Sequence, residues 1–218
     1  MVAPRAAALA TLSLLSLAPR RAEAAWYDEI VDTLQLPAGF SASVYAEVPA
    51  ARSLSYNPAT GTVFVGAYDF SGIQGRDAQL AVYALRDLDG NDDALGPSEA
   101  LPVTQKIANP NGVSFLNGDL FVAQMDHIDK YADIENDIET LKSPTQVVGT
   151  EALPFADGSG LPDTHWHGWR YLTANPATNK LYVTIGSPCN VPGDGEVLGR
   201  ENGIFFRVFP MFVPSLSW

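Results

Sequence analysis

Residues 164–190 read THWHGWRYLTANPATNKLYVTIGSPCN, and this stretch decides the fold. It contains an apolar segment, the polar turn Asn175-Pro176-Ala177-Thr178-Asn179, and a second alternating segment that ends at Gly186. Strand, turn and strand in that order predict a β-hairpin. Two histidines, His165 and His167, stand just before the first segment, so the hairpin carries residues that can do chemistry.

The hairpin pattern occurs twice more upstream. The tetrapeptide NPAT of the turn recurs at Asn57–Thr60, and a middle copy with a shorter turn covers residues 111–123. The second strands begin at Val63, Leu120 and Leu181, a repeat of about 60 residues. Repeats of this kind, built from short strands and turns, are typical of β-propeller blades. We therefore predict an all-β chain, a β-propeller of four-stranded antiparallel blades.

Superposing the three copies brings three polar residues to one equivalent position. Arg52, Asn111 and His167 then each stand just before a first strand. Because the inner strands of a propeller surround its central channel, these side chains are expected to converge there.

Composition excludes several classes of partner. The chain has 218 residues, 46% of them hydrophobic, and a formal net charge of −12. The hydrophobic content predicts a folded core, and the negative charge disfavours nucleic acid and anionic membrane surfaces as partners. The single cysteine, Cys189, excludes an internal disulfide and any site made of several cysteines.

The chain divides into four predicted segments. Residues 1–24 have a positive start, an apolar run and a small-residue cleavage site, which indicate a secretory signal peptide. Residues 25–39 are a short N-terminal helix and lead-in, residues 40–210 a partial propeller, and residues 211–218 an atypical tail. The signal predicts a secreted or periplasmic protein, with an organelle lumen left open. The apolar run is too short to span a membrane.

Finer expectations concern single elements. The helix should cover Trp26–Leu36 and end before Pro37. Alternation predicts strands at Phe40–Ala46 and Leu80–Leu85, and Asp133–Lys142 is weakly helical in character. After the signal peptide the chain holds about three repeats, whereas propellers close with about four to eight blades. We therefore expect an incomplete ring of about three blades.

The acidic loop Arg86–Glu99 reads RDLDGNDDALGPSE. Its side chains Asp87, Asp89, Asn91 and Asp93 alternate, which can gather oxygen ligands around Ca²⁺. The pattern departs from an EF-hand because Asp92 stands where glycine is required. A solvated acidic turn explains the same residues, and both interpretations stay open.

Three stretches together resemble a known family. LPAGFSASVYAEVPAARSLSYNPATGTVFVG, NPNGVSFLNGDLFVAQMD and HWHGWRYLTANPATNKLYVTIGSPCN are similar to the glucose/sorbosone dehydrogenases, six-bladed propellers that depend on pyrroloquinoline quinone. The resemblance runs from about Leu36 to Val208 and corresponds to the N-terminal half of such a propeller.

The resemblance implies a sugar or aldehyde substrate, the quinone as cofactor and a separate electron acceptor. It implies that His167 is the general base that takes the sugar hydroxyl's proton. We assign the cofactor pocket to Arg52, Asn111, His165 and Arg170; the two arginines suit an anionic cofactor. From the residues alone, Asn111 could equally secure its own turn, and the histidines could serve packing.

Two other functions remain open. One is a non-catalytic propeller that acts as a binding or scaffold module, and the other is a calcium-dependent, lactonase-type propeller. Relatives in the family carry most of their quinone-binding cations in later blades, and often have a second cysteine where Val191 and Pro192 stand.

Overall fold

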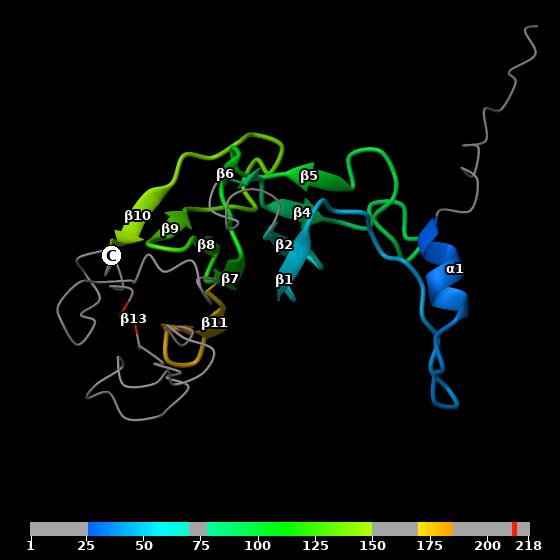
Figure 1. Ribbon diagram of the computed structural model, residues 1–218. Coiled ribbons are helices and arrows are strands. Elements are labelled where there is room, and N and C mark those ends of the chain that lie inside the picture. The colour runs from blue at the N-terminus through cyan, green and yellow to red at the C-terminus, as the bar shows by residue number, and fades with distance from the viewer. Residues whose placement is uncertain (1–25, 70–77, 150–169, 185–210, 213–218) are drawn as a thin grey trace, which may run out of the picture. The chain divides into compact units, whose positions relative to one another are not determined.

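The computed structural model describes residues 26–69, 78–149, 170–184 and 211–212 (Figure 1). The chain divides into two compact units, Met1–Val44 and Tyr45–Trp218. In the first unit the helix α1 covers Trp26–Asp32 and ends earlier than the expected Leu36. In its final turn the N–H of Thr33 donates a hydrogen bond to the carbonyl oxygen of Ile30, at 3.0 Å. None of the helices in the described part of the chain has the length and apolar character that crossing a membrane requires.

The second unit is built from antiparallel sheets. The first sheet has the order β1 (Ala51–Tyr56), β2 (Val63–Ala67), β4 (Tyr83–Leu85), β5 (Ala100–Pro102). The second sheet consists of β7 (Gly112–Leu116), β8 (Asp119–Ala123), β9 (Ile128–Tyr131) and β10 (Thr145–Val148). The third consists of β11 (Leu172–Asn175), β12 (Lys180–Val183) and β13 (Met211–Phe212). A two-stranded sheet pairs β3 (Gln79–Leu80) with β6 (Ile107–Ala108).

The prediction of an antiparallel, nearly all-β chain is confirmed. The three hairpins expected from the repeat are β1–β2, β7–β8 and β11–β12. Within the described residues the sheets do not close into a ring.

Turn chemistry fixes the register of the hairpins. In the first turn the side-chain oxygen of Asn57 accepts the N–H of Ala59 at 3.1 Å, and Gly61 has a positive φ of 80°. In the second, Asn117 and Gly118 have φ of 52° and 91°, the left-handed pair that a two-residue hairpin requires.

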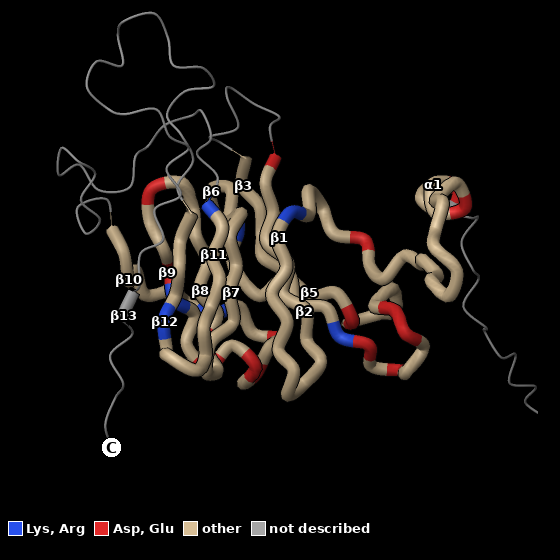
Figure 2. The backbone as a smooth tube through the Cα atoms, turned by 90° about the horizontal axis from the view of Figure 1, so that it is seen from below, with Lys and Arg blue, Asp and Glu red and all other residues tan. Residues whose placement is uncertain are grey.

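The first strands of the three hairpins are neighbours, with β7 between β1 and β11 (Figure 2). One apolar core lies between the first and second sheets and includes Phe64, Val113 and Leu120. Another lies between the second and third sheets and includes Phe121, Leu172 and Leu181. Each sheet therefore buries apolar side chains against the next one in the sequence.

Three local predictions were wrong. Phe40–Ala46 forms no strand, and Phe40 is 72% exposed, because alternation alone supplies no neighbouring strand to pair with. Leu80–Leu85 is divided between β3 and β4, which belong to different sheets. Asp133–Lys142 forms turns, since positive φ values at Asp133 and Asp137 interrupt any helix.

Each of the four predicted segments lies wholly or partly outside the described residues. The signal peptide, residues 1–24, lies wholly outside them. In the tail, only Met211 and Phe212 are described; they form β13 and pair with β12.

Candidate functional site

The starts of β1, β7 and β11 lie at the same edge of their hairpins, where β2, β8 and β12 end. The registers pair Tyr56 with Val63, Phe115 with Leu120, and Ala174 with Leu181. The same step back along β7 and β11 leads to one equivalent position, occupied by Asn111 and Arg170, and in β1 Arg52 lies within the irregular stretch that reaches this position.

This register corrects the superposition made from the sequence. Arg170 takes the position expected for His167, because β11 begins at Leu172 and not at Trp169. The apolar residues before Leu172 suggested an earlier strand start. His165 and His167 themselves lie outside the described residues.

Arg52 is the exposed member of the three. The pairing of β1 with β2 is irregular between Ala51 and Leu54, and such bulges turn side chains out of the regular alternation. The guanidinium carbon of Arg52 lies 5.9 Å from the ring centroid of Tyr68, at cation–π distance. Burial raises the pKa of the Tyr68 hydroxyl, and the charge of Arg52 opposes that rise.

Asn111 and Arg170 connect the second sheet to the third. The side-chain amide of Asn111 donates to the carbonyl oxygen of Arg170 at 2.6 Å, and both residues are buried. A Cβ on Gly112 would lie 2.5 Å from the same oxygen, so the close approach requires glycine. The Asn111 carbonyl in turn accepts the hydroxyl of Ser53 in β1. Asn111 therefore secures a neighbouring sheet and not only its own turn.

Asn109 is a buried amide at this edge that the sequence did not single out. It is 1% exposed, has a φ of 40°, and its oxygen accepts the N–H of Asp69 at 3.2 Å. Among the described residues, its Nδ2 atom has no hydrogen-bond partner. A buried donor left without an acceptor costs about 1–3 kcal/mol, so an acceptor here would be stabilising.

His127 lies in the loop from β8 to β9, next to the same edge. Its Nδ1 is 2.6 Å from a carboxylate oxygen of Asp126, and its Nε2 is 3.5 Å from one of Asp129. Gln124 approaches Nε2 at 2.6 Å and donates to Asp129 at 3.1 Å. The turn itself is closed by a hydrogen bond from the N–H of Gln124 to the carbonyl oxygen of His127, at 3.0 Å.

These contacts raise the pKa of His127 to about 9, chiefly through the hydrogen bond with Asp129 and further through Asp126; burial opposes the rise. Asp129 has the greater influence although it is farther away, because it is buried and Asp126 is half exposed. A protonated ring donates from both nitrogens, and the carboxylates of Asp126 and Asp129 lie next to one nitrogen each. His127 is thus held as a cation, which suits charge pairing better than proton abstraction.

The acidic loop uses most of its side chains on its own backbone. The carboxylate of Asp87 accepts the N–H groups of Gly90, Asn91 and Asp92 at 2.7–3.1 Å. Desolvation would raise the pKa of Asp87, but these backbone donors hold it below its usual value. Asn91 and Asp93 similarly accept N–H groups two residues ahead.

Two of the four predicted cation ligands, Asp87 and Asp89, belong to a group whose oxygen atoms converge. They lie within 4.8 Å of one another and of Glu99, a residue that the sequence pattern missed. Glu99 is 2% exposed and accepts the N–H of Leu88 at 2.8 Å and of Gly96 at 2.6 Å. The loop is therefore organised around its own carboxylates.

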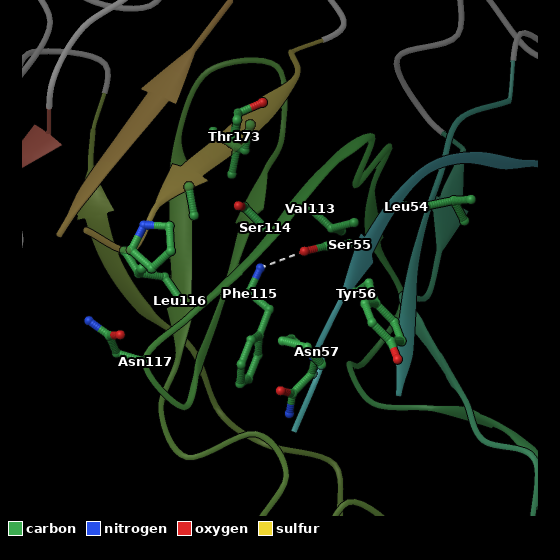
Figure 3. Close-up of a pocket in the computed structure, with 14 residues that line it drawn as sticks. Leu54, Ser55, Tyr56, Asn57, Val113, Ser114, Phe115, Leu116, Asn117 and Thr173 are labelled. Carbon is green, nitrogen blue, oxygen red and sulfur yellow. Dashed lines mark hydrogen bonds between the residues drawn. The ribbon is translucent and has the colours of Figure 1, made fainter. Parts of the chain in front are cut away.

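A groove of about 510 Å³ runs along β1, β7 and β11, away from the edge at which these three strands begin (Figure 3). Its lining includes Leu54, Tyr56, Phe115 and Thr173. The hydroxyl of Ser55 accepts the N–H of Phe115 at 2.8 Å across it.

Comparison with known proteins gives a distant likeness. No family model matches the chain, and no curated protein matches it. Two solved structures are similar to it, an iodide structure and a calcium structure of a Trichoderma reesei protein of carbohydrate-active enzyme family AA12. Identity is 18% and 17%, with TM-scores of 0.47 and 0.45. Each match covers 67% of this chain and 32% of the other, so the chain spans about a third of those structures.

Proposed function

We propose that the sheets are successive blades of a six-bladed propeller and that the protein oxidises a sugar with a quinone cofactor. The observation that supports it is the shared edge of the three hairpins. Arg52 and the Asn111–Arg170 hydrogen bond lie at this edge, and Asn109 stands two residues before Asn111.

The described residues at this edge fit an anionic quinone. Arg52 is an exposed cation, and Asn109 offers a buried N–H donor that lacks an acceptor among the described residues. Charge-assisted hydrogen bonds from such groups suit quinone carboxylates. Arg170 and Asn111 are buried and join the second sheet to the third at this edge, and pyrroloquinoline quinone, when bound, would supply the hydride acceptor.

His167 is the proposed general base. In the sequence it stands three residues before Arg170, which is buried at this edge. An imidazole near its ordinary pKa can take the proton of a sugar hydroxyl. His127 is a poor alternative, because two carboxylates favour its protonated form.

We also propose that the protein is exported and that its partners are small molecules. The predicted signal peptide directs the protein to the secreted or periplasmic space, where an aldose or aldehyde and a diffusible electron acceptor are its partners.

The test is dye reduction with aldoses after reconstitution with pyrroloquinoline quinone. It uses this chain and the longest natural product that contains the sequence. We expect quinone-dependent activity in the form with a closed ring of blades, lost in His167→Ala and retained in His165→Ala.

Absence of quinone-dependent activity from both forms would refute the proposal. Activity that survives His167→Ala would remove His167 from the mechanism.

A further inference from the structure

The turn between β8 and β9 lies at the edge where β7 begins. Ala123, the last residue of β8, pairs with Gly112 of β7 on one side and with Ile128 of β9 on the other. One step further along the pairing of β7 with β8 stand Asn111 and Gln124. The turn that Gln124 opens therefore belongs to the edge at which we propose that quinone and sugar bind.

Asp126 is the exposed end of a chain of polar contacts in this turn. His127 lies 2.6 Å from the Asp126 carboxylate through Nδ1 and 3.5 Å from that of Asp129 through Nε2. Gln124 donates to Asp129 at 3.1 Å, and both of these residues are buried. The side chain of Asp126 is 45% exposed. A buried set of side chains thus holds a carboxylate that solvent can still reach.

The Asp126 carboxylate has acceptor sites to spare. A carboxylate offers about four lone-pair sites on its two oxygens. The contact with Nδ1 of His127 is made by Oδ1 alone, which leaves Oδ2 for a ligand. Adjacent hydroxyl groups of a sugar can each donate a charge-assisted hydrogen bond to such a group. Because His127 already fixes the orientation of Asp126, less freedom is lost when these bonds form.

The position of the turn separates this carboxylate from the groups assigned to the cofactor. In the order β7, β8, β9, the turn lies one to two strand spacings outward from β7, about 5–10 Å. Arg52, the exposed cation, belongs to β1, which neighbours β7 on the side of the first strands. An anionic cofactor beside the first strands therefore leaves the outer part of the edge, with Asp126, to the sugar.

We propose that Asp126 binds adjacent hydroxyl groups of the sugar and selects neutral sugars over acidic ones. His127, together with Asp129 and Gln124, is a positioning group that holds the carboxylate. A neutral aldose supplies the hydroxyl donors that Asp126 accepts, whereas a uronic acid brings a second negative charge against it. The inference rests on the proposed function for its class of ligand, and it deepens that proposal by naming the kind of sugar.

The test is isothermal titration calorimetry, without quinone, on the longest natural product that contains this sequence. The probes are D-glucose and D-galactose, each paired with its uronate, D-glucuronate or D-galacturonate. We expect at least one neutral sugar to bind about tenfold or more tightly than its uronate, because like charges repel in the second complex. Asp126→Asn should weaken binding of that neutral sugar by about tenfold, since hydrogen bonds to a charged acceptor are lost.

The same substitution should also bring the affinities for the neutral sugar and its uronate to within about threefold of each other, because an amide does not repel a carboxylate. A purely structural role for Asp126 would weaken both ligands alike. His127→Gln should weaken the neutral sugar less than Asp126→Asn does and keep the preference, since the charge of Asp126 remains. Asp137→Asn, the same change at an exposed position beyond the other end of β9, is the control and should alter neither affinity. Thermal melts check that every variant is folded.

The inference is overturned if neither neutral sugar binds at up to about 100 mM, or if Asp126→Asn leaves the preference for the neutral sugar unchanged. The expected selectivity without quinone-dependent dye reduction would support this inference and refute the proposed oxidation. Quinone-dependent dye reduction with a preference that Asp126→Asn leaves unchanged would do the reverse.

Discussion

The side-chain amide of Asn111 donates to the carbonyl oxygen of Arg170 at 2.6 Å, and the two residues hold equivalent positions in consecutive hairpins. The bond joins the second sheet to the third at the edge where we propose the quinone binds. Asn111→Ala should therefore lower the free energy of unfolding by about 1–3 kcal/mol, because a buried carbonyl loses its donor. Urea unfolding measures this, and an unchanged midpoint would show that the bond does not hold the sheets together.

Gly112 tests the same junction by steric means. Its added Cβ would lie 2.5 Å from the Arg170 carbonyl, so Gly112→Ala should force the two sheets apart. Gly61→Ala is the comparison: the space around Gly61 is open, and only its φ of 80° costs energy, about 1 kcal/mol. We expect the larger loss of stability at Gly112; equal losses would argue against the close approach.

Glu135 binds the first NPAT turn through three side chains. Glu135→Ala should cost about 1–3 kcal/mol of unfolding free energy, because Asn57 is buried and loses its acceptor. The exposed Glu139 provides the control, and Glu139→Ala should change stability by less than about 0.5 kcal/mol. Similar effects at the two positions would mean that the carboxylate does not secure the turn.

His127 should make stability depend on pH. Its pKa rises from an ordinary value near 6.5 to about 9 in the folded chain, so folding favours the protonated ring. That contribution is complete below pH of about 6.5 and is lost as the pH rises through about 9. Tyr131, whose pKa is raised to about 12 by burial and by Asp129, titrates above this window.

Thermal melts between about pH 6 and about pH 9.5 bracket the two pKa values of His127. The stability of the unchanged chain should therefore fall as the pH rises over this range, and the profile of His127→Gln should be flatter. Asp129→Asn should flatten the profile more than Asp126→Asn does. A profile that rises with pH, or one that His127→Gln leaves as steep, would contradict the contacts described.

The repeat carried most of the information that the sequence held about the fold. Strand, turn and strand at three similar spacings predicted the hairpins, because alternation and turn residues act locally. Phe40–Ala46 alternates just as well and forms no strand, since pairing depends on a neighbour that local sequence does not encode.

The site was harder to predict than the fold. The sequence predicted Arg52, Asn111 and His167 at one equivalent position, but the register of β11 puts Arg170 where His167 was expected, because β11 starts later than its apolar residues suggested. Asn109, Glu99 and His127 were missed: their roles depend on burial and on partners brought together by the sheets. For His127 the sequence did offer a signal, because a histidine stands close to two aspartates and a glutamine in Gln124, Asp126 and Asp129.

The most direct measurement of the proposed function is aldose-dependent dye reduction, with and without added quinone, in paired His167→Ala and His165→Ala variants of the longest natural product that contains this sequence. The account predicts activity that requires the quinone, disappears in His167→Ala and persists in His165→Ala. Equal activity with and without the quinone, or activity retained in His167→Ala, would contradict it.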